Sequence, residues 1–237
     1  MGRSFQALGE PRAASRKDMP VTARDWTVVE HLQAGPLGCN CTILGCTRTK
    51  EAWVIDPGGD APAIEAVLEK HGLRLVGLFH THAHFDHLGA TSDLRERHAG
   101  AVMLHADDLP LWEMAPMQAS WFGMTMDAPP PVDRLVAHDE LVGIGDLPGR
   151  VVHTPGHTPG SVCLHVPDLD LLLAGDTLFA GSVGRTDLPG GSWEALQRSI
   201  RERLLDLPDG TLVIPGHGPA TTIGAERATN PFLGRRG

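Results

Sequence analysis

One short stretch constrains this chain more than any other, because three histidines and one carboxylate fall within six positions. They are His82, His84, Asp86 and His87. The preceding residues 73–79 are apolar and partly β-branched, which is typical of a buried strand. The stretch is therefore expected in the turn at the carboxyl end of a strand, where ligands gather in α/β sheets. Because zinc-like metals prefer imidazole and carboxylate ligands, we interpret it as a metal site rather than a polar turn.

Three later segments repeat the same plan of an apolar strand, a tight turn with Gly or Pro, and a metal-type ligand. Residues 151–157 end in His157, residues 171–176 in Asp176, and residues 212–217 in His217. Glycine and proline allow close backbone approach and fix the direction of the side chain. If the four strand ends converge, seven ligands meet. That number exceeds what one zinc-like ion needs and suits two ions, which a carboxylate can bridge.

The remaining pattern predicts alternating strands and helices with no repeat or dividing linker, and so a single α/β domain. Predicted strands cover residues 26–31, 41–45, 52–56, 73–79, 101–104, 135–137, 140–144, 150–153, 161–166, 169–174 and 211–214. Predicted helices run from Pro62 to Gly72, over residues 87–98, over 193–205 after an N-cap at Ser192, and over 223–229. Residues 105–132 are the least regular stretch. We weigh two interpretations of them, an irregular segment covering the core and a loop forming one wall of a substrate cleft.

Composition and charge limit the classes of partner. At 237 residues the chain fits one large domain or two small ones, and its formal net charge of -9 argues against a nucleic-acid partner. No apolar run is long enough for a membrane span, and residues 1–20 lack the apolar core of a signal peptide. We expect a cytoplasmic monomer or weak homo-oligomer. Its domain should cover residues 25–237 after a disordered tail at 1–24, with Met19 as an alternative start to Met1.

The cysteines do not form a recognisable zinc motif. There are four of them, Cys39, Cys41, Cys46 and Cys163. Three lie close together, but no pair has the two-residue spacing of a zinc ribbon or a redox motif. We expect reduced residues in strands or the core, which is typical of a reducing compartment.

Together these motifs resemble the metallo-β-lactamase superfamily. They are His-Xaa-His-Xaa-Asp-His at 82–87, Pro-Gly-His at 155–157, Gly-Asp at 175–176 and Pro-Gly-His-Gly at 215–218, with further likeness at 56–59, 154–160, 184–187 and 230–232. The match is closest to the glyoxalase II-like, or hydroxyacylglutathione hydrolase-like, branch of the short bacterial type. It covers about residues 25–233 and implies an αββα sandwich with metals in a groove at one edge.

The resemblance also implies roles for particular residues. It assigns His82, His84 and His157 to a first metal ion, Asp86, His87 and His217 to a second, and Asp176 to a bridge between them. Two divalent ions per chain are expected, with zinc the first choice and iron or manganese also compatible. Asp86 and Asp176 are expected to be catalytic as well, because they would orient the attacking water.

Other polar residues near these motifs are open to two interpretations. Arg185, next to Asp187 in a glycine-rich loop, is either half of an ion pair or a fixed cation for a substrate carboxylate. His153 is interpreted as a polar residue at a strand end. The remaining histidines are expected to be structural or exposed, namely His31, His71, His98, His105, His138 and His165.

A thioester substrate suits this apparatus, because a thiol with a pKa of about 8.5 leaves as thiolate without a strong general acid. We expect hydrolysis of a small S-acyl thiol, such as S-lactoylglutathione to D-lactate and glutathione. The larger enzymes of the branch contact glutathione through a helical C-terminal region and tyrosines, whereas this chain ends soon after His217 and has no tyrosine. The thiol carrier therefore stays open.

Three alternatives are weighed. A mononuclear iron persulfide dioxygenase of the same fold has similar ligand motifs. A nuclease of this fold is disfavoured by the net charge. A non-catalytic metal-binding module is disfavoured by the complete ligand set, since such a module can lose a ligand without penalty.

Overall fold

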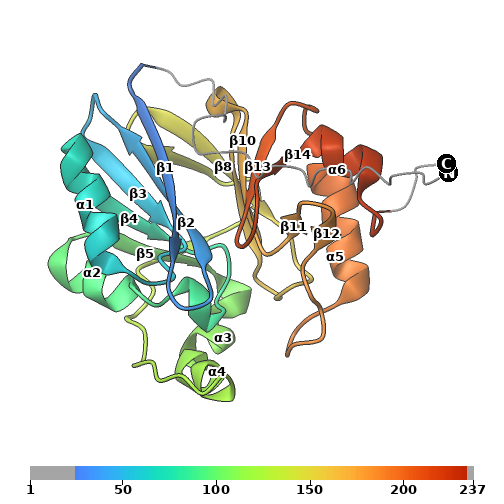
Figure 1. The fold of residues 1–237 in the computed structure, drawn as a ribbon, viewed down its shortest axis with the longest axis horizontal. Coiled ribbons are helices and arrows are strands. Elements are labelled where there is room, and N and C mark those ends of the chain that lie inside the picture. The colour runs from blue at the N-terminus through green and yellow to red at the C-terminus, as the bar shows by residue number, and fades with distance from the viewer. Residues whose placement is uncertain (1–24, 234–237) are drawn as a thin grey trace, which may run out of the picture.

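The computed structural model describes residues 25–233, and Figure 1 shows two β-sheets packed face to face with helices on both outer faces. The predicted tail at 1–24 and the alternative start at Met19 lie outside the described residues. The expected four-layer αββα sandwich is confirmed. None of the helices within 25–233 is long and apolar enough to cross a membrane.

The first sheet has six strands in the order β1-β2-β3-β4-β5-β6. They are β1 (Thr27–Ala34), β2 (Cys39–Cys46), β3 (Glu51–Ile55), β4 (Arg74–Phe79), β5 (Ala101–His105) and β6 (Arg134–Val136). The first two pairings are antiparallel, and β3 to β6 run parallel. Every residue of β2 is buried, because this strand lies in the interior of the sheet and both its faces are covered.

The second sheet also has six strands, in the order β14-β13-β10-β9-β8-β7. They are β7 (Leu141–Ile144), β8 (Leu147–His153), β9 (Val162–Val166), β10 (Leu171–Gly175), β13 (Leu212–Pro215) and β14 (Thr221–Thr222). A separate hairpin pairs β11 (Leu178–Phe179) with β12 (Ser182–Val183). Because β10 and β13 run parallel as neighbours, their carboxyl ends lie side by side at one edge.

The helices cover the outer faces of the sheets. Against the first sheet lie α1 (Ala61–His71), α2 (Thr91–Arg97), α3 (Leu109–Glu113) and α4 (Ala115–Trp121), and against the second lie α5 (Trp193–Ser199), continued by a π-helical turn at Ile200–Leu204, and α6 (Ile223–Thr229). Helix α1 has proline in its first turn and ends at Gly72 in the left-handed conformation, as predicted. Ser192 caps α5 by accepting a hydrogen bond from the Ala195 amide.

Three apolar clusters fill the spaces between the four layers. The middle cluster joins the two sheets, with Trp53 and Phe79 from the first stacked at 6.0 Å and packed against Val151 and Leu164 of the second. The outer clusters pack the helices of each side onto their own sheet. All four cysteines are free and buried, as predicted.

Two predictions about local structure need correction. The predicted helix at 87–98 begins only at Thr91, because Gly89 approaches the Gly58 carbonyl so closely that a Cβ would lie 2.3 Å from it. The Ala90 amide bonds to Pro57 O at 2.8 Å, so residues 88–90 serve that contact rather than a helix. Residues 105–132 are more regular than expected and contain α3 and α4, each with proline in its first turn. The short strands β11, β12 and β14 were not predicted.

Candidate metal centre

The histidine-rich stretch follows β4 and is held by a buried carboxylate from the neighbouring strand. Asp56, just after β3, accepts hydrogen bonds from the Thr81 amide (2.8 Å) and the Thr81 hydroxyl (2.6 Å). The start of β9 joins the same turn, because the Val162 amide donates to Thr81 O at 2.8 Å. The turn is therefore fixed to both sheets, at the edge of the molecule where their strands end.

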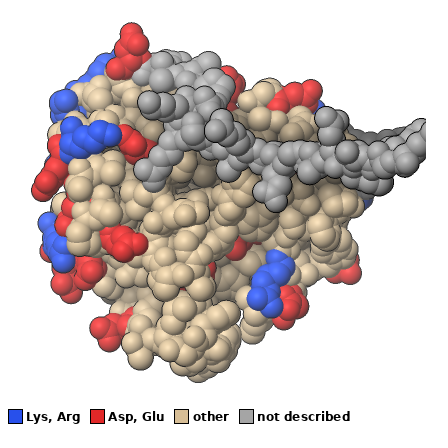
Figure 2. Space-filling model, viewed as in Figure 1, with Lys and Arg blue, Asp and Glu red and all other residues tan. Residues whose placement is uncertain are grey.

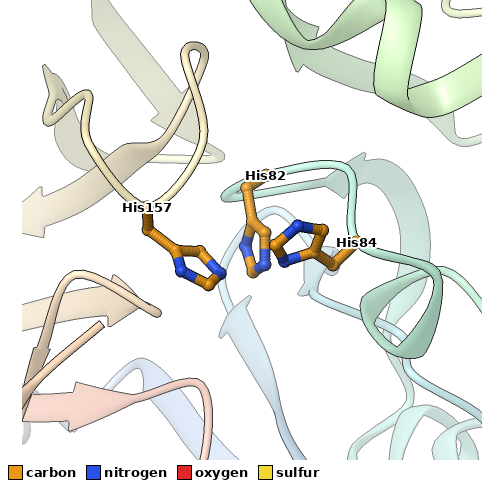
Figure 3. Close-up of side chains that lie close together, drawn as sticks. All are labelled: His82, His84 and His157. Atoms are coloured by element: carbon orange, nitrogen blue, oxygen red, sulfur yellow. The ribbon is translucent and has the colours of Figure 1, made fainter. Parts of the chain in front are cut away.

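His82, His84 and His157 form a first cluster, and each offers a ligand atom within 4.8 Å of the others. All three side chains are buried. Figure 3 shows that His82 and His84 come from one loop and His157 from another, with the three rings facing a common space. The rings meet at steep angles of 75–88°, with centroids 4.6–4.8 Å apart. In-plane nitrogen lone pairs can converge on one point in this arrangement.

Within residues 25–233, three buried atoms at the histidine clusters have no hydrogen-bond partner. They are His82 Nε2 and His157 Nε2 of this cluster and Asp176 Oδ1, which lies toward His87. Buried polar atoms are almost always satisfied, since an unpaired one costs about 1–3 kcal/mol. His157 Nδ1 lies 2.8 Å from Arg185 O, so the proton belongs on Nδ1 and Nε2 keeps a free lone pair. These orphaned atoms fit a bound metal ion.

The protonation states agree with that fit. Burial, together with the neighbouring His157 and His87, lowers the pKa of His84 to about 3. Burial and the surrounding imidazoles likewise hold the pKa of His82 well below its ordinary value. Both rings are therefore neutral near pH 7, which is the form that binds metal.

Asp86, His87 and His217 form a second cluster whose ligand atoms also lie within 4.8 Å of one another. His217 Nε2 is 3.1 Å from Asp86 Oδ2 and 3.2 Å from His87 Nε2. The hydrogen bond that His217 donates to the Asp86 carboxylate raises the pKa of His217, although burial and the nearby His87 oppose the shift. This cluster is more open than the first, because His217 and Asp86 are only partly buried.

Asp176 lies between the two clusters, and each of its oxygens faces one of them. Oδ2 is 3.5 Å from His157 Nε2, and Oδ1 is 3.6 Å from His87 Nε2. The adjacent strand end leaves room for this side chain, because a Cβ on Gly216 would lie 2.1 Å from Asp176 Oδ1. Asp176 therefore joins the two clusters, with one oxygen toward each.

His87 is oriented from behind by two buried groups on its Nδ1 side. Asp56 Oδ2 lies 3.1 Å from that nitrogen, and the Cys39 sulfur lies 3.4 Å from it. Burial raises the pKa of the Cys39 thiol to about 11, so it stays protonated. With Nδ1 engaged, Nε2 is the atom that His87 presents to the second cluster.

Asp108 supports the first cluster, and sequence reasoning missed it. It is fully buried and accepts hydrogen bonds from the amide of Ala83 (2.9 Å), the hydroxyl of Thr158 (2.8 Å) and the amide of Gly160 (2.6 Å). One carboxylate thus fastens the loop of His82 and His84 to the loop of His157. Its only signal in the sequence was an acidic residue just after a strand, in a stretch left without a role.

A cavity of about 250 Å³ opens over both clusters. Its floor contains five of the predicted ligands, His84, Asp86, His157, Asp176 and His217. One side of the cavity is lined by Leu111 of α3, by Trp121 at the end of α4 and by Phe122 just after it. This lining favours the interpretation of residues 105–132 as one wall of a substrate cleft. A larger groove of about 660 Å³ adjoins Phe85 but touches only Asp86 among the ligands, so the smaller cavity is the one above the site.

All seven predicted ligands are brought together. The predicted substrate cation, Arg185, also lines the cavity, but its guanidinium is paired with Asp187 at 2.7 and 2.8 Å. Both interpretations of Arg185 therefore remain compatible. His153 does lie at a strand end, half buried, and its ring stacks on His105 at 4.1 Å.

Comparison with known proteins places the chain in a family. The model of the metallo-β-lactamase superfamily matches residues 34–217, and the chain belongs to this superfamily. Hydroxyacylglutathione hydrolase GloC of Haemophilus influenzae is 39% identical over 82% of this chain and 92% of its own length. The probable metallo-hydrolase YqgX of Bacillus subtilis is 40% identical over 85% of this chain and 95% of its own length.

Solved structures agree on the fold. BLEG-1, described as a B3 metallo-β-lactamase, superimposes with a TM-score of 0.81 at 39% identity, over 87% of this chain and 99% of BLEG-1. TTHA1623, solved in a di-iron-bound form, gives 0.79 at 40% identity, over 86% and 100%. ETHE1 from Myxococcus xanthus gives 0.70 at 29% identity, over 86% and 83%. Because the chain belongs to this superfamily and is similar to its metallo-hydrolases, these comparisons support a metal-dependent hydrolase. They do not identify its substrate.

Proposed function

We propose that this protein hydrolyses a small S-acyl thiol, as a glyoxalase II-like enzyme that converts S-lactoylglutathione, or a similar thioester, into a hydroxy acid and a free thiol. The observation that carries the proposal is the complete pair of ligand clusters with Asp176 facing both, beneath an open cavity. The likeness to GloC supports the choice of substrate class.

In this proposal His82, His84 and His157 hold one divalent ion, Asp86, His87 and His217 hold a second, and Asp176 is shared. The ions supply Lewis acidity and lower the pKa of a water toward about 7. Zinc suits the donor set, and iron or manganese does too. The di-iron form of TTHA1623 supports a content of two ions per chain. Which metal fills the site would then depend on the metals that the cell supplies.

The chain's own residues position the reactants. Asp86 and Asp176 face the cavity and would hold the attacking water, whose proton passes to solvent, with its oxygen toward the substrate. Attack forms a bond from that oxygen to the thioester carbon, the C–S bond breaks, and the thiol leaves as thiolate. Among the described residues that line this cavity, the polar side chains besides the ligands are Gln118 and Arg185. Gln118 is engaged by three backbone groups, so a leaving group that needs no acid fits best.

The testing experiment measures three quantities on one metal-replete preparation. These are thiol release from S-lactoylglutathione, metal content per chain, and oxygen uptake with glutathione persulfide. Thiol release with about two ions per chain is the expected result. Oxygen uptake with one iron would replace the proposal by the persulfide dioxygenase alternative. Folded protein that turns over neither substrate would instead favour the non-catalytic module.

A second candidate reaction comes from the likeness to BLEG-1, described as a B3 metallo-β-lactamase. A β-lactam ring also presents an electrophilic carbonyl that the same residues could face. A chromogenic cephalosporin belongs in the same assay for this reason. If its kcat/KM exceeds that of every thioester, a β-lactam hydrolase becomes the better conclusion.

We further propose that the protein works in a reducing compartment such as the cytoplasm, as a monomer or weak homo-oligomer. The four buried, unpaired thiols support the compartment. Size-exclusion chromatography with light scattering measures the oligomeric state directly.

A further inference from the structure

The cavity above the metal centre has two chemically different sides. Trp121 and Phe122, at the end of α4, lie with Leu111 on one side, and Arg185 lies in the loop that follows β12 on the other. In Figure 1 the α3–α4 pair and that loop lie at the same end of the molecule, the pair on the side of the first sheet and the loop on the side of the second. A substrate that spans the cavity therefore meets aromatic rings at one end and, at the other, a cation beside the apolar Leu188 and Pro189.

The aromatic side is an organised surface. The rings of Phe85 and Phe122 pack at 5.2 Å, and Phe85 belongs to the buried core beneath the first sheet. Yet Trp121 and Phe122 are 50% and 48% exposed. Figure 2 shows that the lobe formed by α3 and α4, at the bottom of the view, carries few charged side chains on this face. Large aromatic rings exposed beside a cavity mark a binding surface, because burying them against a ligand is favourable.

The cavity offers little to a highly charged ligand. Arg185 is the only Lys or Arg among the described residues of its lining, and it already shares its guanidinium with Asp187. The side-chain amide of Gln118 accepts a hydrogen bond from the Phe85 amide and donates to the carbonyls of Ala83 and Leu111. A carrier with several charged groups would therefore leave most of them in water. Recognition must come largely from apolar contact.

Resting on the proposed hydrolase function, we propose that Trp121 and Phe122 form an acyl-binding wall that makes the enzyme prefer thioesters with apolar acyl groups larger than lactoyl. The thiol carrier extends toward Arg185, which contacts one carboxylate of it. The acyl chain lies against the two rings, where each buried methylene adds to the binding of the transition state.

The test is a series of thioesters that share one carrier and differ in the acyl chain, namely S-acetyl-, S-butyryl- and S-hexanoylglutathione. Burial of each methylene should raise kcat/KM by about two- to fourfold until the cavity is filled. The readout is the ratio of kcat/KM for the hexanoyl and acetyl substrates within one preparation. This ratio is independent of the fraction of active or metal-loaded protein.

Variants then locate the wall. Trp121→Ala and Phe122→Ala should each lower the hexanoyl-to-acetyl ratio by about fivefold or more. Met117→Ala is the matched control, because Met117 is equally exposed on the same helix but does not line the cavity. As a binding readout without turnover, S-hexylglutathione should bind more tightly than S-methylglutathione by calorimetry, and Trp121→Ala should remove the difference.

The outcomes separate this inference from the function on which it rests. A flat or falling acyl series in the wild type, with thioesters still hydrolysed, overturns the acyl-binding wall alone. A rising series that Met117→Ala reduces as much as Trp121→Ala also overturns it. Absence of turnover with every thioester overturns the proposed function and the wall together.

Discussion

Two groups of histidines in this molecule have similar distances between their ligand atoms but differ in the angles between their rings and in the hydrogen bonding of their nitrogens. His82, His84 and His157 lie within 4.8 Å of one another, and so do ligand atoms of His105, Asp107 and His153. In the first group the rings meet at steep angles, whereas His105 and His153 stack with only 13° between their planes. The lone pairs of stacked imidazoles run parallel and cannot converge on one ion.

The use of the ring nitrogens separates the groups further. His82 Nε2 and His157 Nε2 are buried without a partner, while His153 Nε2 is 2.9 Å from Pro159 O and donates to it. His105 Nδ1 accepts a hydrogen bond from the Asp107 amide at 3.3 Å. Proximity alone therefore does not define a metal site. What defines it is a set of converging nitrogens that the protein leaves unsatisfied, and the following predictions test that distinction.

The largest effect is expected from Asp176→Ala. Each oxygen of this carboxylate faces a different cluster. Its removal should therefore weaken the binding of both metal ions and lower kcat/KM by about a thousandfold or more. Metal analysis after dialysis and the thioester assay measure the two effects. Asp187→Ala, an exposed carboxylate outside the clusters, is the control for metal content. Two tightly held ions in Asp176→Ala would contradict the shared role.

The next prediction compares two histidines on the same strand–turn segment. His157→Ala should lose about one equivalent of metal, whereas His153→Ala should keep both, because His153 already uses its Nε2 on a carbonyl. Metal content per chain by elemental analysis tests both variants. Loss of metal from His153→Ala would mean that the stacked group does take part in binding, and the distinction drawn above would fail.

A smaller effect is expected from Asp108→Asn. Ala83 and Thr158 donate to one oxygen and Gly160 to the other, so an amide nitrogen must face at least one donor. The two loops of the first cluster should loosen, and affinity for one of the two ions should fall about 10- to 100-fold. Chelator competition measures that affinity. Asp107→Asn, next in the chain and exposed, is the matched control.

A purely structural role for Asp108 predicts a different pattern. In that case the metal-free variant would melt at a lower temperature, while the loaded enzyme would keep its affinity for both ions. Melting curves of the metal-free wild type and Asp108→Asn therefore accompany the titration. Unchanged affinity with lowered stability would refute the positioning role.

The ligands could be predicted from sequence because all of them follow apolar strands. His82, His84, Asp86 and His87 crowd into one stretch after such a strand, and His157, Asp176 and His217 each follow a glycine at a strand end. The carboxyl ends of β10 and β13 are neighbours in a parallel pair, so Asp176 and His217 had to meet. The alternation of strands and helices predicted a single α/β domain, and the resemblance of the motifs to the superfamily implied its four layers. Both inferences rested on local patterns in the sequence.

The supporting residues could not be predicted in this way. Asp108 acts through donors 25, 50 and 52 residues away, and no local pattern encodes such contacts. Helices α3 and α4 escaped prediction because they are short, and their apolar residues serve two purposes. Some pack on the core and others, such as Trp121, face the cavity, so the helical periodicity is blurred.

The smallest expected effect concerns the stacked pair. Burial and the neighbouring His153 lower the pKa of His105, and Asp107 only partly opposes them. A histidine whose pKa is lower in the folded than in the unfolded state stabilises the fold above the unfolded pKa, about 6.5, and loses that contribution as the pH falls toward the folded value.

His105→Phe keeps an aromatic ring in the stack but cannot bind a proton. Between pH 7.5 and 5.0 its Tm should therefore fall less than that of the wild type, by about 1–3 °C. Metal-free protein must be used, so that release of the ions at low pH does not contribute. An equal fall in both proteins would show that the stack does not resist protonation, and the two histidine groups would then differ in geometry alone.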